Sequence, residues 1–161
     1  YWGMLAYMVK KTGKLSISKE FDKNKLDNLS IGLAKHYRKN IHKTPFMLSR
    51  LKRHGNQFQK SFNHYDLYLS PVLAQTPRPL AELSPKQSFD SLFDRLMRYA
   101  SFTPMANVAG TPAISIPAGH SSEGLPIGVQ LSGRYGDEKT LLEIAYELEE
   151  LQPWKLLHEN G

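Results

Sequence analysis

The chain has 161 residues, 40% of them hydrophobic, and it carries a formal net charge of +6 at pH 7. This size and composition allow one domain with a substantial core and exclude a chain that is disordered throughout. The absence of cysteine excludes disulfides, thiolate nucleophiles and cysteine-bound metals. No run approaches the roughly 18 consecutive apolar residues of a membrane-spanning helix, so we expect a soluble protein and take the cytoplasm as its compartment.

The opening "YWGMLAYM" starts at Tyr1 rather than at a methionine and is mostly aromatic or aliphatic. We therefore expect the chain to be a piece of a longer polypeptide. Positive charge gathers between Lys10 and Lys60, a pattern that can meet nucleic acid or anionic lipid. Because the basic residues fall at helical spacing among leucines, without an aromatic platform, we interpret them as a solvated helix face. We expect no nucleic-acid partner and no membrane.

The pattern divides the chain into a mainly helical segment, residues 1–64, and a second region, residues 65–161. In the first segment an apolar stripe predicts a helix that ends near Lys39 and is capped by Asn24 or Asp27. The two parts are expected to form one structural unit.

A second helix is expected from Thr44 toward Phe62. The Thr44 hydroxyl is the expected N-cap, and the proline after it suits the first helical position. The aromatic and aliphatic run 65–73 then predicts a buried strand that leaves into a surface loop. Beyond that loop, apolar residues at three- and four-residue spacing predict a helix over 88–101.

The segment "FTPMANVAG" predicts a short helical turn that ends at Gly110. Two short strands, 113–117 and 127–131, follow, and the glycines and serines between them indicate an antiparallel hairpin. A closing helix is expected after Asp137, which can cap it, and Pro153 ends it.

The tetrapeptide His120-Ser121-Ser122-Glu123 suggests a hydrolytic centre, because serine catalysis needs a base and an orienting group. Neighbouring side chains on an extended segment point in different directions, and the spacing is not the G-x-S-x-G of a nucleophile elbow. We interpret this stretch as the hairpin turn. The six histidines show no H-x-x-x-H spacing, and no phosphate-binding glycine loop is present. We expect no catalytic residue, no metal and no cofactor in this chain.

Three stretches occur in order: "YDLYLSPVLAQTPRP", "FTPMANVAGTPAISIPAG" and "GLPIGVQLSGRYGDEKTLLEIAYELEE". Together they closely resemble the C-terminal region of the amidase signature family, over roughly Tyr65 to Trp154. That family includes bacterial amidases, cyclic-oligoamide hydrolases and the A subunit of glutamyl-tRNA amidotransferase. The resemblance implies an α/β fold, with a mixed sheet flanked by helices in three α/β/α layers.

The resemblance also implies hydrolysis of carboxylic amides through an acyl-enzyme. The family's nucleophile is a serine, activated by a second serine in a cis peptide and by a lysine, and all three precede the matched region. This chain by itself is therefore expected to be inactive and to supply structural support and part of the pocket for a small-molecule amide.

By position in the family, Phe102, Met105 and Asn107 are the candidates for contacting substrate. Each has a simpler alternative: Phe102 and Met105 as ordinary core, and Asn107 as a hydrogen-bonding partner of loop backbone. Gln130 is expected to be a buried polar group whose amide satisfies neighbouring backbone.

Three further expectations concern partners and rival functions. The family's sheet is built from both halves of the protein, so the isolated chain is expected to self-associate, for example as a homo-oligomer, through uncovered surface. The rival functions are the A subunit of glutamyl-tRNA amidotransferase and a non-catalytic, amidase-like binding or scaffold module.

Overall fold

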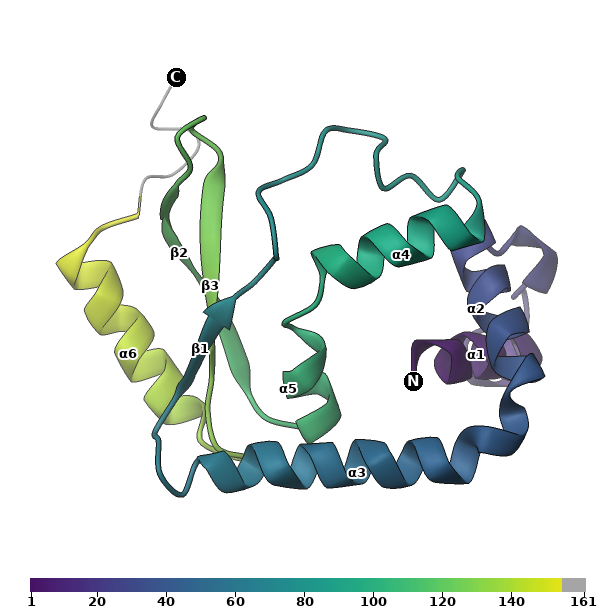
Figure 1. Ribbon diagram of the computed structural model, residues 1–161, viewed down its shortest axis with the longest axis horizontal. Helices are drawn as coiled ribbons and strands as arrows, with labels where there is room; N and C mark the ends of the chain where they lie inside the picture. The colour runs from purple at the N-terminus through teal and green to yellow at the C-terminus, as the bar shows by residue number, and fades with distance from the viewer. Residues whose placement is uncertain (155–161) are drawn as a thin grey trace. The chain divides into compact units, whose positions relative to one another are not determined.

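The computed structural model describes residues 1–154 (Figure 1). They form two compact units, one of residues 1–50 and 78–99, and the other of residues 51–77 and those from 100 onward. No helix among the described residues is long and apolar enough to cross a membrane. The elements, in chain order, are α1 Trp2–Ser16, η1 Lys23–Lys25, α2 Asn28–Lys39, η2 Ile41–Lys43, α3 Thr44–Ser61, β1 Tyr68–Pro71, α4 Phe89–Tyr99, α5 Pro104–Ala109, β2 Ala113–His120, β3 Pro126–Ser132 and α6 Glu138–Leu151.

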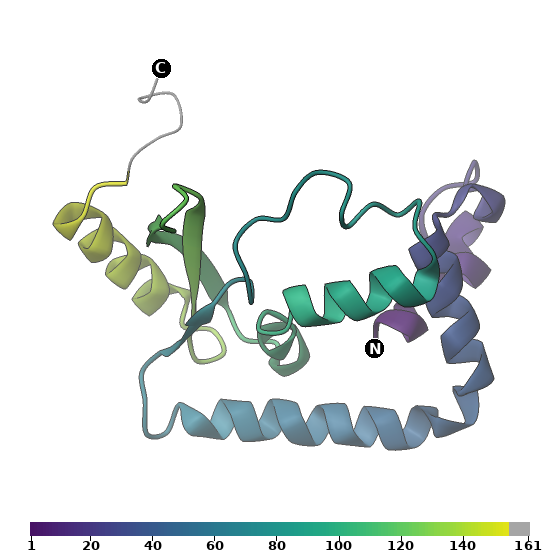
Figure 2. The same ribbon diagram turned by 45° about the horizontal axis from the view of Figure 1, so that its top comes forward.

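Helices α1 and α2 lie side by side in the first unit (Figure 1, Figure 2). A Cβ on Gly3 of α1 would lie 3.1 Å from the carbonyl oxygen of Leu33, so glycine permits the close approach of the two helices. The rings of Tyr7 and Tyr37 meet with centroids 5.5 Å apart. Helix α1 lies in the segment expected to be mainly helical, but no helix was predicted at its position.

Helix α2 begins at the cap that the sequence offered at Asp27. Its carboxylate accepts hydrogen bonds from the backbone N–H and the hydroxyl of Ser30, both at 2.9 Å. Asn24, the other candidate, lies in η1 instead. Helix α4 covers the far side of α2, where the ring of Phe89 fills the space above Gly32 and stacks on Phe93.

Helix α3 starts at Thr44 as predicted, but the expected capping role of the Thr44 hydroxyl is wrong. That hydroxyl donates to the carbonyl of Ile41 at 2.6 Å and also meets the hydroxyl of Tyr37 at 2.7 Å. The reason is that η2 runs directly into α3, so Thr44 has helical backbone angles, whereas an N-cap residue is non-helical.

The second unit holds a three-stranded sheet in the order β1-β3-β2, with both strand pairs antiparallel. The predicted hairpin is confirmed, and it is longer than expected because pairing extends to His120 opposite Pro126. A bulge lies between Pro117 and Gly119. The α/β fold class is likewise confirmed, and the likeness to solved structures described below supports it.

One face of this sheet packs against α6 (Figure 1). The core there consists of Ile116, Leu131, Leu141 and Ala145, which are all at most 6% exposed. Helix α6 begins after Asp137, as predicted, but the Asp137 carboxylate accepts a hydrogen bond from the Thr140 hydroxyl instead of capping a backbone N–H.

The prediction of a buried strand over 65–73 is wrong in both length and burial. Strand β1 has four residues, and only Ser70 among them is buried. Leu69 is 62% exposed, and Tyr65 before the strand is 70% exposed. The physical reason is that β1 lies at the edge of the described sheet, since it pairs with β3 alone. An apolar strand is fully buried only where other strands pair with both of its edges and other elements cover both faces of the sheet.

Candidate functional site

Helix α5 and the turn before it hold the three residues that the resemblance assigns to substrate contact. Pro104 opens the helix, where a missing N–H costs nothing, and Gly110 closes it with a left-handed φ of 66°. The Thr111 N–H bonds back to the carbonyl of Ala106 at 3.2 Å. The predicted helical turn with Gly110 at its end is therefore confirmed.

Phe102 and Met105 are 38% and 41% exposed, so neither is an ordinary core residue among the described residues. Phe102 lies two residues before α5, and its carbonyl accepts a hydrogen bond from the Met105 N–H at 3.4 Å, so the two residues belong to one turn of the chain. Asn107 is also exposed, but it lies two residues from Met105 and projects from a different face. Its amide donates to the carbonyl of Thr103 at 3.4 Å. The structure thus groups the two apolar candidates and places Asn107 beside them.

The C-terminal part of α3 supports α5. A Cβ on the buried Gly55 would lie 3.0 Å from the carbonyl oxygen of Val108 and 3.3 Å from the Cα of Ala109. The side-chain amide of Gln59 donates to the carbonyl of Ala109 at 3.2 Å. Glycine therefore allows the α5 backbone to lie directly on α3, and Gln59 satisfies a carbonyl at the end of α5.

The sheet face opposite α6 is polar. Ser70, Gln130 and Ser115 lie opposite one another across the three strands. The Gln130 amide donates to the hydroxyl of Ser132 at 3.2 Å, so it satisfies a side chain and not the backbone that the sequence analysis expected. Among residues 1–154, the buried hydroxyls of Ser70 and Thr111 have no hydrogen-bond partner.

The sequence indicated Gln130 as a buried polar residue, but the polar row that it forms with Ser70 and Ser115 was not predicted. A signal was present, because Gly128, Gln130 and Ser132 alternate with apolar residues along β3. The partners on β1 and β2 depend on strand register, which the sequence does not specify.

The serine pair in the hairpin serves the turn. The Ser121 hydroxyl accepts hydrogen bonds from the N–H groups of Glu123 and Leu125, both at 3.2 Å. Its backbone N–H donates to the Leu125 carbonyl at 2.8 Å, and Gly124 has a left-handed φ of 78°. These are the contacts of a structural turn, and the interpretation of this stretch as a turn is confirmed.

No group of three or more His, Asp or Glu residues suited to a metal ion occurs within the described part of the chain. A lowered pKa is resolved for the Asp27 carboxyl, and its main cause is the hydrogen bond from the Ser30 backbone N–H. This group caps α2 in the first unit, so its pKa reports on helix capping and not on catalysis.

Comparisons with known proteins identify the family to which this fold belongs. A family model described as "Amidase" matches residues 5–142. A Mycobacterium leprae protein named "Putative amidase AmiC" is 43% identical over 155 residues, which cover 96% of this chain and 33% of that protein. The chain belongs to the amidase family.

The solved structures that are similar to the chain include two of different kinds. One, 6-aminohexanoate cyclic dimer hydrolase, has a TM-score of 0.75 and 25% identity over 95% of this chain and 33% of its own. The other, the A subunit of the Thermotoga maritima glutamyl-tRNA(Gln) amidotransferase, has a TM-score of 0.53 and 29% identity over 76% of this chain and 28% of its own. The chain spans about a third of the length of the relatives and structures that it matches.

Proposed function

We propose that this chain is part of an enzyme that hydrolyses carboxylic amides. The observation that carries the proposal is the extent of the family likeness, which runs from α1 to α6 and includes the α5–Gly110–β2 segment. The likeness to a cyclic-dimer hydrolase over 95% of the chain favours a small amide as substrate.

The proposed chemistry is that of the amidase signature family. A serine oxygen attacks the amide carbonyl, the C–N bond breaks, and the amine leaves with a proton delivered through the serine–lysine pair. Water then cleaves the resulting ester and restores the serine. The serine, the cis-serine and the lysine of this scheme lie outside the 161 residues. This chain alone is therefore expected to be inactive.

The proposed contribution of this chain is one wall of the substrate pocket. Phe102 and Met105 are exposed apolar side chains at the start of α5, a helix that packs on α3, so they suit the apolar part of an amide substrate. Asn107 is proposed to orient a polar substrate group through its amide. In the described structure this amide has only a long, intrahelical hydrogen bond to exchange for a substrate contact.

The test uses the full-length protein with aryl and cyclic amides as substrates. Phe102→Ala or Met105→Ala is expected to raise KM by about tenfold, because each removes apolar contact worth about 1–2 kcal/mol. Matched controls are Phe46→Ala and Met97→Ala, which remove exposed side chains of the same kinds from the first unit. An unchanged KM in both site variants would contradict the proposed role of α5, and turnover by the 161-residue chain alone would contradict the placement of the triad.

The first alternative function is the A subunit of a glutamyl-tRNA amidotransferase. The solved protein of this kind aligns with less of the chain than the cyclic-dimer hydrolase does, and its TM-score is lower. If the full-length protein hydrolyses simple amides without partner proteins, this alternative is excluded. Recovery of activity only with co-purifying proteins would favour it.

The second alternative is a binding or scaffold module without chemistry. A fluorophosphonate probe labels an activated serine, so failure of the full-length protein to react, together with no turnover of any amide, would favour this alternative over the enzyme.

A further inference from the structure

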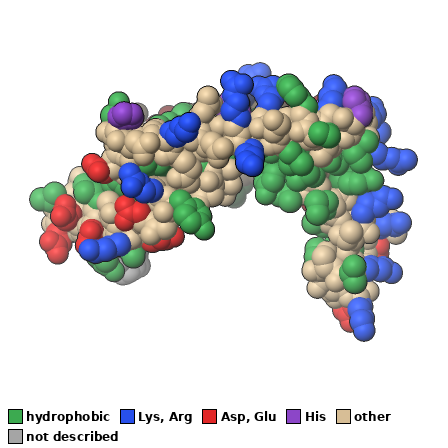
Figure 3. Space-filling model, turned by 90° about the horizontal axis from the view of Figure 1, so that it is seen from below, with side chains coloured by type: hydrophobic (Ala, Val, Ile, Leu, Met, Phe, Trp, Pro, Cys, Tyr) green, Lys and Arg blue, Asp and Glu red, His purple; other side chains and the backbone are tan. Residues whose placement is uncertain are grey.

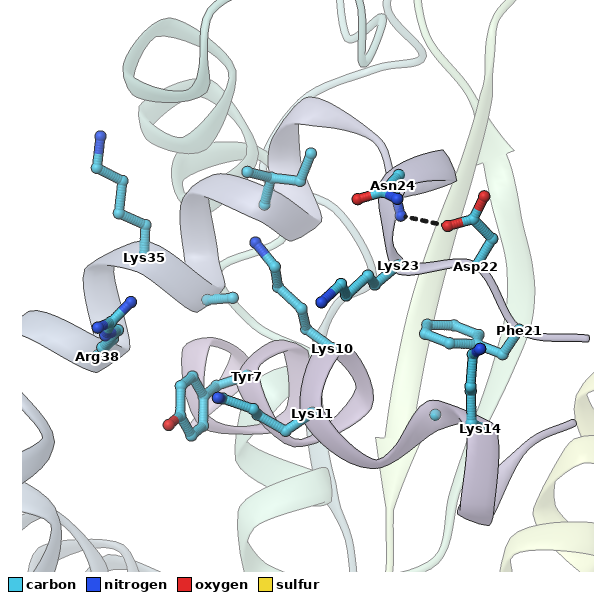
Figure 4. A pocket seen from close by; sticks show the side chains of 13 residues that line it. Tyr7, Lys10, Lys11, Lys14, Phe21, Asp22, Lys23, Asn24, Lys35 and Arg38 are labelled. Carbon is cyan, nitrogen blue, oxygen red and sulfur yellow. Dashed lines mark hydrogen bonds between the residues drawn. The ribbon is translucent and has the colours of Figure 1, made fainter. Parts of the chain in front are cut away.

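A cavity of about 870 Å³ lies in the first unit, between α1, η1 and α2 (Figure 4). Its volume falls within the range of small-molecule binding pockets. All of its lining residues belong to residues 1–50, so the cavity is complete within one compact unit.

Six cationic side chains line this cavity. Blue Lys and Arg side chains lie along the right-hand edge of the molecule in Figure 3, and Figure 4 shows lysines from α1, η1 and α2 around the cavity. The six are Lys10, Lys11, Lys14, Lys23, Lys35 and Arg38.

The cavity wall provides almost no compensating negative charge. Asp22 is the single acidic residue in the lining, and its carboxylate already accepts a hydrogen bond from the Asn24 backbone N–H at 2.9 Å. None of the six cations forms an ion pair with another residue in the described part of the chain. Like charges gathered around one hollow repel one another, and a bound polyanion relieves that repulsion.

The base of the cavity is apolar and partly aromatic. Gly13 and Ala34 are buried there, and the ring of Phe21 lies against Gly13, where a Cβ would collide with it. The ring of Tyr7 forms another part of the lining and packs on Tyr37. Both lining rings are half-buried, so they offer a flat apolar contact inside the hollow and no open stacking surface for a long strand.

We propose that this cavity binds a small ligand that carries a chain of phosphates. The number of cations suits a ligand with several negative charges, and five of them are lysines, which bind phosphate as mobile point charges. The volume of about 870 Å³ matches a small molecule better than a nucleic-acid strand. The shared chemistry is the phosphate chain, supplied by either an inorganic polyphosphate or a nucleoside triphosphate, and the site is independent of the proposed amide hydrolysis.

The test is isothermal titration calorimetry of the full-length protein with inorganic tripolyphosphate and, separately, with ATP, in both cases without divalent cations. Both ligands are expected to bind. Equal affinities would assign recognition to the phosphates alone, and tighter binding of ATP would assign a further contact to Tyr7 and Phe21. Raising the salt concentration from about 0.05 M to about 0.3 M should weaken binding by roughly tenfold, because screening shortens the reach of the charges.

Variants test the location of the site. Lys10→Gln with Lys35→Gln removes one cation from each helical wall and is expected to weaken tripolyphosphate binding at least about tenfold. The control, Lys25→Gln with Lys39→Gln, makes the same change in net charge at exposed residues of η1 and α2 that do not line the cavity. The control should retain affinity within about twofold.

Two results would overturn the proposal. One is an equal loss of affinity in the site and control variants, which would show a diffuse response to net charge. The other is failure of the protein to bind either tripolyphosphate or ATP, and binding of a single-stranded RNA oligonucleotide by such a protein would assign the basic residues to nucleic acid instead. Circular dichroism and the melting temperature without ligand are measured for each variant, and a second site variant, Lys14→Gln with Arg38→Gln, replaces any that unfolds.

Discussion

The contact between α3 and α5 yields the sharpest stability prediction. The substitution Gly55→Ala adds one methyl group where α3 touches the α5 backbone. That methyl carbon would lie 3.0 Å from the Val108 carbonyl oxygen and 3.3 Å from the Cα of Ala109. Both neighbours are backbone atoms, so no side chain can rotate away, and α5 or α3 has to move by a few tenths of an ångström.

Two effects of opposite sign determine the outcome. Alanine stabilises a helix interior by about 1 kcal/mol relative to glycine. Overpacking in a tight site costs about 1–3 kcal/mol. Since both obstructing atoms belong to backbone, we expect the cost to be near 2 kcal/mol. The net loss is then about 1 kcal/mol, which for a chain of this size lowers Tm by about 2–4 °C.

The assay is thermal unfolding of the Gly55→Ala variant beside Asn56→Ala. Asn56 is the exposed neighbour of Gly55 on the same helix, so its replacement reports helix propensity without the contact. The control should be stabilised by about 0.5 kcal/mol. If Gly55→Ala is stabilised as much as the control or more, the contact between α3 and α5 is looser than described, and the support that α3 is proposed to give Phe102 and Met105 is lost.

Three further predictions concern other parts of the chain. Asp27→Ala should destabilise the protein by about 0.5–1 kcal/mol at neutral pH, since it removes the cap of α2. Because the folded-state pKa of Asp27 is lowered, the stability that the cap contributes is present above the ordinary aspartate pKa and is lost as the pH falls through the folded-state value. Urea unfolding should therefore show a smaller difference between variant and parent in acid. Ser121→Ala should lower the free energy of unfolding, measured by chemical denaturation, by about 1 kcal/mol, because two turn N–H groups lose their acceptor. Ser122→Ala should leave it unchanged, and equal losses in the two variants would contradict the turn geometry. Leu141→Ala should lower the free energy of unfolding by about 2–5 kcal/mol, whereas replacement of the half-exposed Leu142 by alanine should lower it by under about 1 kcal/mol. Calorimetry can measure this difference, and equal losses would show that α6 packs in another register.

The elements that local chemistry determines could be predicted from the sequence. Gly110 ends α5 because its left-handed backbone suits glycine, and Asp27 caps α2 because its carboxylate reaches an N–H three residues on. The hairpin follows from its turn residues in the same way. Thr44 departed from its predicted role because the residues before it formed a 3₁₀ turn, which the sequence pattern did not indicate.

What depends on neighbours distant in sequence could not be predicted. The run 65–73 looks apolar enough to be buried, yet β1 has a single pairing partner among the described strands. In the sequence, Gly55 is only a residue of low helix propensity, whereas in the structure the α5 backbone packs directly against it. For the candidate site, the sequence resemblance selected Phe102, Met105 and Asn107, but only the structure shows that the first two share the turn at the start of α5.

The proposed amide hydrolysis requires a nucleophilic serine that lies outside these 161 residues. The most direct measurement is to inactivate the full-length protein with a fluorophosphonate during amide turnover and to locate the modified residue by peptide mass spectrometry. We expect loss of activity with one modified serine that is absent from this chain. Stoichiometric modification of Ser121, Ser122 or any other serine of this chain would contradict it.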